Sequence, residues 1–146
     1  MLFKKQDKDK YGVIKYSSIN IGDEVQSVAA MRFLPRIDYY VQRERIDQFK
    51  PNSGEKVKLI MNAWWMWDYV HFPPAPEIDP LFVSFHLREK IRKKFTDKFM
   101  TEEVIKYFKD HGPIGCRDIT TAKYLQEFGI DAYFSGCLTM TLLPNK

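Results

Sequence analysis

Two short segments place chemically capable side chains directly after apolar runs. His86 ends the run Leu81–His86, and Arg117 and Asp118 follow Cys116. A histidine can exchange a proton near neutral pH, and an arginine offers a planar pair of donors to a carboxylate or phosphate. We therefore expect His86 to act as an acid or base and Arg117 to bind an anion. The alternatives are a structural His86, and an Asp118 that caps a helix or pairs with Arg117.

A third segment, Asn20-Ile21-Gly22-Asp23, opens a predicted helix. Backbone amides around Asn20 and Gly22 can hold an anion at the positive end of that helix. Asp23 favours a different use, because a carboxylate can bind sugar hydroxyls or cap the helix. The segment is neither a GxGxxG nor a P-loop motif, so the sequence does not support nucleotide binding by those devices.

The segment Ser135-Gly136-Cys137-Leu138-Thr139 also follows a short apolar run. We expect Ser135, Gly136 and Thr139 to contribute to a binding site, since Gly136 permits a tight turn with close backbone approach. Cys137 as a nucleophile would need a neighbouring base, which no residue nearby in the sequence supplies. A packed thiol is the alternative.

The cysteines and the other two histidines do not predict a metal site. Cys116 and Cys137 form no CxxC pair and predict free thiols in a reducing compartment. His71 and His111 lie far from one another and lack carboxylates at ligand spacing.

Three tryptophans, Trp64, Trp65 and Trp67, lie close together before a proline-rich segment. They cannot all point into one core. Exposed aromatic rings stack on sugar rings, so this cluster predicts either a saccharide contact or packing of core and loop.

Apolar runs and helical repeats alternate along the chain. They predict an α/β class: a Rossmann-like, mainly parallel sheet with flanking helices. We expect strands over 11–16, 37–42, 57–64, 81–86, 112–116 and 132–137, and helices from Asp23 to before Pro35, from Thr101 to Lys109 and from Asp118 to Gly129. In an open parallel sheet, ligands bind beyond the carboxyl ends of the strands. This rule selects the same segments that were chosen above for their chemically capable side chains.

Composition sets the broad class. The chain has 146 residues, of which 45% are hydrophobic and 15% aromatic, which excludes disorder for most of its length. We expect a flexible N-terminus over 1–10 and one domain over 11–146. No apolar stretch approaches the ~20 residues that span a bilayer, and no secretory signal is visible, so we expect a cytoplasmic protein. The net charge of +4 does not argue for nucleic acid, and the basic stretch 88–98 predicts a solvated face or a phosphate-binding surface.

The motifs Ile19–Ser27, Gly112–Asp118 and Phe134–Thr139 resemble those of the polysaccharide pyruvyl transferase family. The similarity extends from Tyr11 to Leu142. It implies a domain like the N-terminal one of a two-domain, GT-B-like enzyme. It also implies transfer of a pyruvyl group from phosphoenolpyruvate to sugar hydroxyls, with no cofactor beyond that donor substrate.

On this resemblance, Asn20, Asp23 and His86 would contact the saccharide acceptor, with His86 and Asp23 as the catalytic residues. Arg117 would face the donor, and Asp118 would also belong to the substrate-binding residues. Ser135 to Thr139 would shape the floor of the cleft. Family members continue into a second Rossmann-like half, so we expect a C-terminal partner half or self-association. The rival hypotheses are a non-catalytic glycan-binding module and a half-enzyme that needs a separately encoded half.

Overall fold

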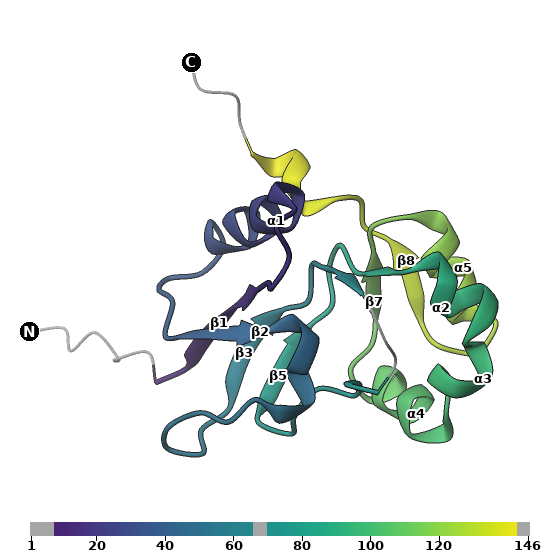
Figure 1. Cartoon of the computed structure of the whole chain (residues 1–146), viewed down its shortest axis with the longest axis horizontal. Helices are drawn as coiled ribbons and strands as arrows, with labels where there is room; N and C mark the ends of the chain where they lie inside the picture. Colours follow the sequence, from purple (N-terminus) through teal and green to yellow (C-terminus); the bar gives the residue numbers. More distant parts are fainter. Residues whose placement is uncertain (1–7, 66–69, 143–146) are drawn as a thin grey trace, which may run out of the picture.

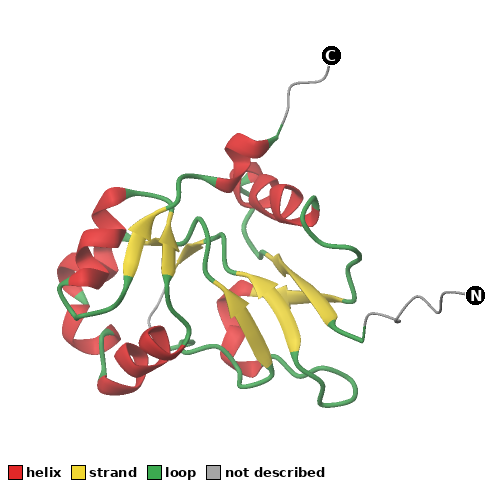
Figure 2. Ribbon diagram, turned by 180° about the vertical axis from the view of Figure 1, so that it is seen from behind, coloured by secondary structure: helices red, strands yellow, loops and turns green. Residues whose placement is uncertain are grey.

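Strands and helices alternate along the chain, as the apolar runs predict. The computed structural model describes residues 8–65 and 70–142, and Figures 1 and 2 show their strands side by side with helices around them. All strand pairs among these residues are parallel, so the α/β class with a mainly parallel sheet is confirmed. The elements are, in chain order, β1 (Lys10–Lys15), α1 (Ile21–Met31), β2 (Tyr39–Gln42), η1 (Arg43–Gln48), β3 (Val57–Ile60), β4 (Trp64–Trp65), β5 (Ile78–Leu81), β6 (His86–Leu87), α2 (Glu89–Lys94), α3 (Thr96–Phe99), α4 (Glu102–Asp110), β7 (Ile114–Cys116), α5 (Ile119–Gln126), β8 (Ala132–Phe134) and η2 (Leu138–Thr141).

The order of the strands places a switch point beside β1. Strands β2, β1, β3 and β5 form a four-stranded sheet in that order, and the pairs β4–β6 and β7–β8 follow. A parallel bridge between Phe85 and Cys116 joins these two pairs, so the strands continue across the molecule in a Rossmann-like arrangement. The chain leaves β1 for β2 on one side and returns past β1 to β3 on the other. In doubly wound sheets, ligands bind at the carboxyl edge at such a switch point.

Two predicted strands are broken in the structure. The strand expected over 57–64 is split into β3 and β4, and the one expected over 81–86 is wrong, because β5 ends at Leu81 and β6 begins at His86. Ser84 lies in this second break with φ of 59°, in the left-handed region that is unfavourable for residues other than glycine. Its N–H donates to Ser135 Oγ at 2.9 Å, and its own Oγ accepts from the N–H of Leu138 at 2.9 Å. At this break the backbone is held by hydrogen bonds with serine side chains instead of by pairing with a neighbouring strand. The apolar run 81–86 gives no sign of this.

Helix α1 begins at Ile21, two residues before the position predicted from sequence. Asn20 is its N-cap, and its side-chain oxygen accepts from the N–H of Gly22 at 3.0 Å. Asp23 therefore lies inside the first turn, and the expectation that it starts or caps the helix is wrong. The helix ends at Met31, before Pro35, as predicted.

The other helix ends follow their sequence signals more closely. Thr101 caps α4 and Asp118 caps α5, as predicted, and Gly129 follows α5 with φ of +67°. The basic stretch 88–98 forms most of α2 and α3.

Aromatic side chains fill the core. Phe108 of α4 lies 5.1 Å from Phe72, 5.6 Å from Phe82 and 5.7 Å from Phe85 between ring centroids. Trp65 is fully buried and stacks on Phe85 at 6.0 Å. This cluster fixes the strands on which the carboxyl-edge residues are mounted.

Candidate functional site

A cavity of about 400 Å³ opens at the switch point between β1 and β3. It lies where the topology of the sheet predicts a ligand site. Four residues predicted from sequence line it: Asn20, Gly22, Asp23 and Arg117. The remaining lining residues are Ser18, Gln26 and Trp64.

The N-terminus of α1 forms one wall of the cavity. The Gly22 N–H that the sequence offered to an anion is already bonded to Asn20. Asp23 and Glu24 add two carboxylates to the same first turn, where an anionic ligand would meet repulsion. This wall therefore suits a ligand that donates hydroxyl protons better than an anion.

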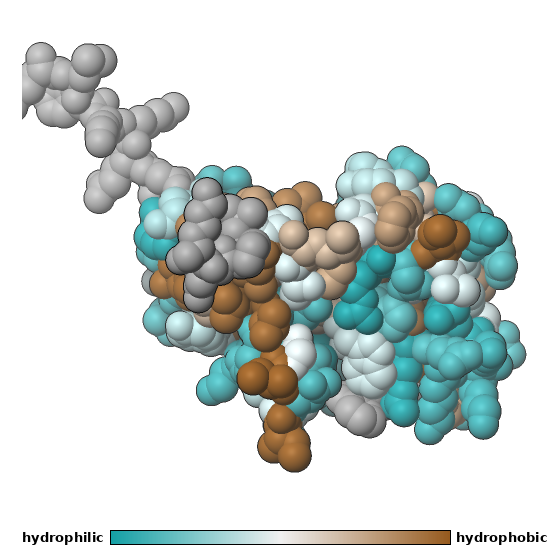
Figure 3. Space-filling model, turned by 90° about the horizontal axis from the view of Figure 1, so that it is seen from above, coloured by the Kyte–Doolittle hydropathy of each residue, from teal (hydrophilic) through white to brown (hydrophobic). Residues whose placement is uncertain are grey.

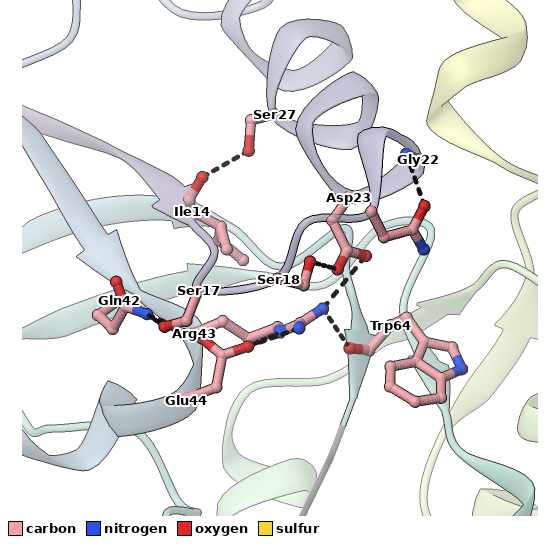
Figure 4. A network of polar contacts seen from close by, with 11 residues as sticks. Ile14, Ser17, Ser18, Gly22, Asp23, Ser27, Gln42, Arg43, Glu44 and Trp64 are labelled. Atoms are coloured by element: carbon pink, nitrogen blue, oxygen red, sulfur yellow. Dashed lines mark hydrogen bonds and ion pairs between the residues drawn. The ribbon is translucent and has the colours of Figure 1, made fainter.

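Arg43 lies beneath that wall and was missed by the sequence reasoning. Its side chain is 3% exposed and lies 3.3 Å from Asp23. Figure 4 shows Asp23, Arg43, Glu44 and Trp64 converging from α1, η1 and β4. The signal was available, because Arg43 directly follows the carboxyl end of β2. It was overlooked because Arg43 stands in a charged run typical of a solvated surface.

His86 and Asp118 form a hydrogen-bonded pair. His86 Nδ1 lies 2.5 Å from Asp118 Oδ2, and the two side chains are 17% and 30% exposed. The two residues were each selected from sequence, but their pairing across 32 positions was not predicted. His86 is also the register partner of Trp64, which brings the pair to the edge that carries the cavity. Neither His86 nor Asp118 is among the residues that line the cavity; their neighbours Trp64 and Arg117 are.

The pKa shifts of the two residues make His86 a neutral imidazole beside an ionised Asp118 carboxylate. Burial lowers the pKa of His86, and the hydrogen bond to Asp118, which acts in the opposite direction, does not outweigh it. Burial alone would raise the pKa of Asp118, but hydrogen bonds from His86 and Thr121 hold it far below its usual range. Near neutral pH the imidazole therefore donates Nδ1–H to a charged Asp118. This leaves the lone pair of Nε2 to accept a proton.

Cationic and aromatic groups surround Trp64. The side chain of Trp64 is half-buried in the cavity wall, whereas Trp65 is fully buried in the core. A contact of Trp64 with a saccharide stays a prediction. Trp67 lies outside the described residues. The guanidinium of Arg88 lies 5.3 Å from the centre of the Trp64 ring, and Arg117 lines the same cavity. Arg88 begins the basic stretch 88–98 noted from the sequence, but its contact with Trp64 was not predicted.

The segment after β8 lies behind the cavity. Ser135 Oγ accepts from the N–H of Ser84, and its hydroxyl lies 3.1 Å from the carbonyl oxygen of Cys116 and 3.4 Å from that of Gly136, so its hydrogen bonds are internal. Gly136 has φ of +78° and turns the chain. Thr139 Oγ1 lies 3.0 Å from Cys137 Sγ. These residues do not line the cavity as Asn20 and Asp23 do, and their predicted contact with a ligand stays a prediction.

Cys137 contacts the cavity wall indirectly. Gln26, which lines the cavity, lies 3.5 Å from Cys137 Sγ through its Nε2. Burial raises the pKa of Cys137, but hydrogen bonds with Thr139 and Gln26 outweigh that effect and lower it. Burial instead raises the pKa of Cys116 to about 12. Both cysteines are free thiols.

A larger cavity, of about 570 Å³, lies at the opposite edge, beside the first residues of β3 and β5. Asp47, Lys56, Lys106 and Tyr107 are among its lining residues. Its lysines are already engaged: Lys56 with the carbonyl of Pro76, and Lys106 with Asp110. Asp47 pairs with His71 at 2.9 Å, so a histidine–carboxylate pair is present at both edges. We assign the site to the carboxyl edge, because the switch point of the sheet lies there and the residues predicted from sequence line its cavity.

The described ranges, 8–65 and 70–142, contain no group of three or more His, Cys, Asp or Glu residues that could hold a metal ion. None of their helices is long and apolar enough to cross a membrane. Comparison of the chain with protein-family models, curated proteins and solved structures finds no match.

Proposed function

We propose that this chain is an acceptor-binding domain of the pyruvyl transferase type. In this proposal a saccharide binds in the carboxyl-edge cavity. His86 accepts the proton of the hydroxyl that attacks phosphoenolpyruvate. The observation that carries the proposal is the hydrogen-bonded pair of His86 and Asp118 beside a cavity lined by Asp23, Trp64 and Arg117.

The reaction uses two hydroxyls of one saccharide. Both oxygens bond to C2 of phosphoenolpyruvate, the bond from C2 to the phosphate oxygen breaks, and a cyclic ketal and inorganic phosphate are released. Of the two hydroxyl protons, one ends on C3, which becomes a methyl group, and the other leaves with phosphate. His86 is suited to this proton transfer, because a neutral imidazole accepts a proton and returns it within one cycle.

The cavity wall supports a saccharide ligand. Asp23 can accept hydrogen bonds from hydroxyls, and the half-buried Trp64 offers an aromatic face to a sugar ring. Arg117 can pair with the carboxylate or phosphate of the donor. The first-turn carboxylates of α1 favour placing the uncharged acceptor, rather than the donor, against that helix.

A second candidate function is glycan binding without transfer, either as a module or as half of an enzyme. It is favoured by one observation: Arg117 is the single cation among the described residues that line the cavity. A donor that carries both a phosphate and a carboxylate calls for several convergent cations. In the half-enzyme version, a separately encoded half would supply them.

The site is tested by a titration followed by heteronuclear NMR. The ¹⁵N-labelled chain is titrated with methyl glycosides of galactose, glucose and mannose, and separately with phosphoenolpyruvate. We expect a glycoside to shift the Gly22 amide and the Trp64 indole resonances. Phosphoenolpyruvate should shift the amide and side-chain NH resonances of Arg117. Glycoside-induced shifts confined to Lys56, Lys106 and Tyr107 would move the site to the opposite edge and overturn the assignment.

A further inference from the structure

Arg43 connects three of the elements that build the cavity. Its Nη1 donates to the carbonyl of Trp64 at 3.0 Å and lies 3.3 Å from Asp23 Oδ1. Its guanidinium lies over the ring of Tyr16, 4.6 Å from the centroid. Figure 4 shows Asp23 and the Trp64 carbonyl beside this guanidinium. Arg43 thereby joins the end of β1, the first turn of α1 and the start of β4.

Glu44 holds the other side of the same guanidinium. Glu44 Oε1 accepts from Arg43 Nε at 2.8 Å and from Nη2 at 2.5 Å. Glu44 is held in turn by Gln42, whose Nε2 donates to Oε2 at 2.9 Å. Short charge-assisted bonds of this kind are stronger than a longer single contact. Arg43 is therefore bound mainly to Glu44, and its contact with Asp23 is the weaker one.

Asp23 is oriented by this arrangement without being saturated. A carboxylate offers about four lone-pair positions for hydrogen bonds. Ser18 donates to Oδ2 at 2.5 Å, and Arg43 lies against Oδ1. Because Asp23 lines the cavity, its remaining lone pairs can accept two neighbouring hydroxyls of a bound molecule.

We infer that Arg43 is the positioning residue of this site, and that the ligand it prepares Asp23 for is a diol. Arg43 holds Asp23 and Trp64 in one fixed relation, so that a sugar ring on Trp64 presents adjacent hydroxyls to Asp23. The choice of a saccharide as ligand rests on the proposed function. The positioning of Asp23 and Trp64 by Arg43 does not.

The first arm of the test uses the chain without any ligand. Arg43→Met removes the charge and the guanidinium donors but leaves an unbranched side chain. Arg43→Lys keeps a positive charge but lacks the planar pair of N–H donors. Arg36→Met is the matched control, because Arg36 also pairs with an aspartate, Asp38 at 3.2 Å, away from the cavity. We expect both Arg43 variants to shift the Asp23 amide and Trp64 indole resonances, and Arg36→Met to leave them in place. Unchanged resonances in a folded Arg43 variant would overturn the inference.

The second arm measures affinity for the methyl glycosides. Arg43→Met should weaken binding about 10-fold or more, the effect expected when a group that orients a binding residue is lost. Arg43→Lys should recover part of this loss. Combining Arg43→Met with Asp23→Asn should cost less affinity than the sum of the two single losses, since part of the effect of the arginine is exerted through Asp23. Additive losses would show a merely structural role and overturn the inference.

The outcomes separate the inference from the proposed function. If the wild-type chain binds no glycoside, the saccharide function and the diol fail together, and the ligand-free arm decides whether Arg43 positions Asp23 and Trp64. If Arg43→Met does not fold, Arg43→Lys is read by the same criteria.

Discussion

Asp118 caps helix α5 and also accepts a hydrogen bond from His86, and substitutions can separate these two roles. Its Oδ1 caps α5 by accepting from the N–H of Thr121 at 2.9 Å. Its Oδ2 accepts from His86 and, at 2.9 Å, from Thr121 Oγ1. Asp118→Asn keeps a good capping residue and one acceptor oxygen but removes the charge. Asp118→Ala removes all three interactions.

The cost of each change follows from these contacts. Loss of an N-cap costs about 1 kcal/mol, and a buried donor left without an acceptor costs about 1–3 kcal/mol. We therefore expect Asp118→Ala to lower the free energy of unfolding by about 2–4 kcal/mol. Asp118→Asn should lower it by about 1 kcal/mol or less, because the cap remains.

The same pair of variants tests the electrostatic argument. Asp118 acts to raise the pKa of His86 against the effect of burial. Both variants should therefore lower the pKa of His86 further. The assays are urea unfolding followed by fluorescence, and NMR titration of the imidazole Hε1 proton. The control is Asp110→Ala, at an exposed pair with Lys106, which should change the free energy of unfolding by less than about 0.5 kcal/mol.

Two results would refute this reasoning. An Asp118→Ala variant as stable as wild type would mean that neither the cap nor the contact with His86 contributes. A His86 pKa that is unchanged in both variants would mean that the carboxylate does not act on the imidazole.

Three further predictions concern pH, reactivity and packing. The folded pKa of His86 lies below its unfolded value of about 6.5, so its contribution to stability is complete above that pH and is lost as pH falls through the folded pKa. His86→Gln should flatten urea-unfolding stability below pH ~6.5, and an unaltered pH profile would contradict this. Iodoacetamide should alkylate Cys137 faster than Cys116, because hydrogen bonds lower the pKa of the first and burial raises that of the second; peptide mass spectrometry showing equal rates would count against it. Gly115→Ala should cost about 1–3 kcal/mol in urea unfolding, since a Cβ there would lie 2.9 Å from the Phe82 carbonyl oxygen, and a loss below about 0.5 kcal/mol would rule out that clash.

The sequence was most informative where a single rule acted locally. Asn20, Gly22, Asp23 and Arg117 were selected because they follow apolar runs, and the parallel sheet brings them to one cavity. The caps at Thr101 and Asp118 were predicted for the same reason, because capping depends on a few adjacent residues.

Features that depend on distant contacts were missed. Asn20 rather than Asp23 caps α1, and Asp23 instead contacts Ser18 and Arg43, the latter 20 positions along the chain. The pairing of His86 with Asp118 depends on β6 and β7 lying side by side, which the separate motifs do not state. The break at Ser84 depends on side-chain hydrogen bonds from the segment after β8.

The claim that His86 is the base for pyruvyl transfer is tested most directly by a turnover experiment. The chain is incubated with [2-¹³C]phosphoenolpyruvate and a panel of saccharides, and ¹³C NMR follows conversion of the labelled enol carbon to a ketal carbon. His71→Ala is the matched control, since His71 also pairs with a carboxylate, Asp47 at 2.9 Å, away from the cavity. We predict ketal formation by the wild type and His71→Ala, and none by His86→Ala. Ketal formation by His86→Ala at the wild-type rate would contradict the role of His86. No ketal with any saccharide that binds would contradict transfer altogether and leave glycan binding without transfer as the function.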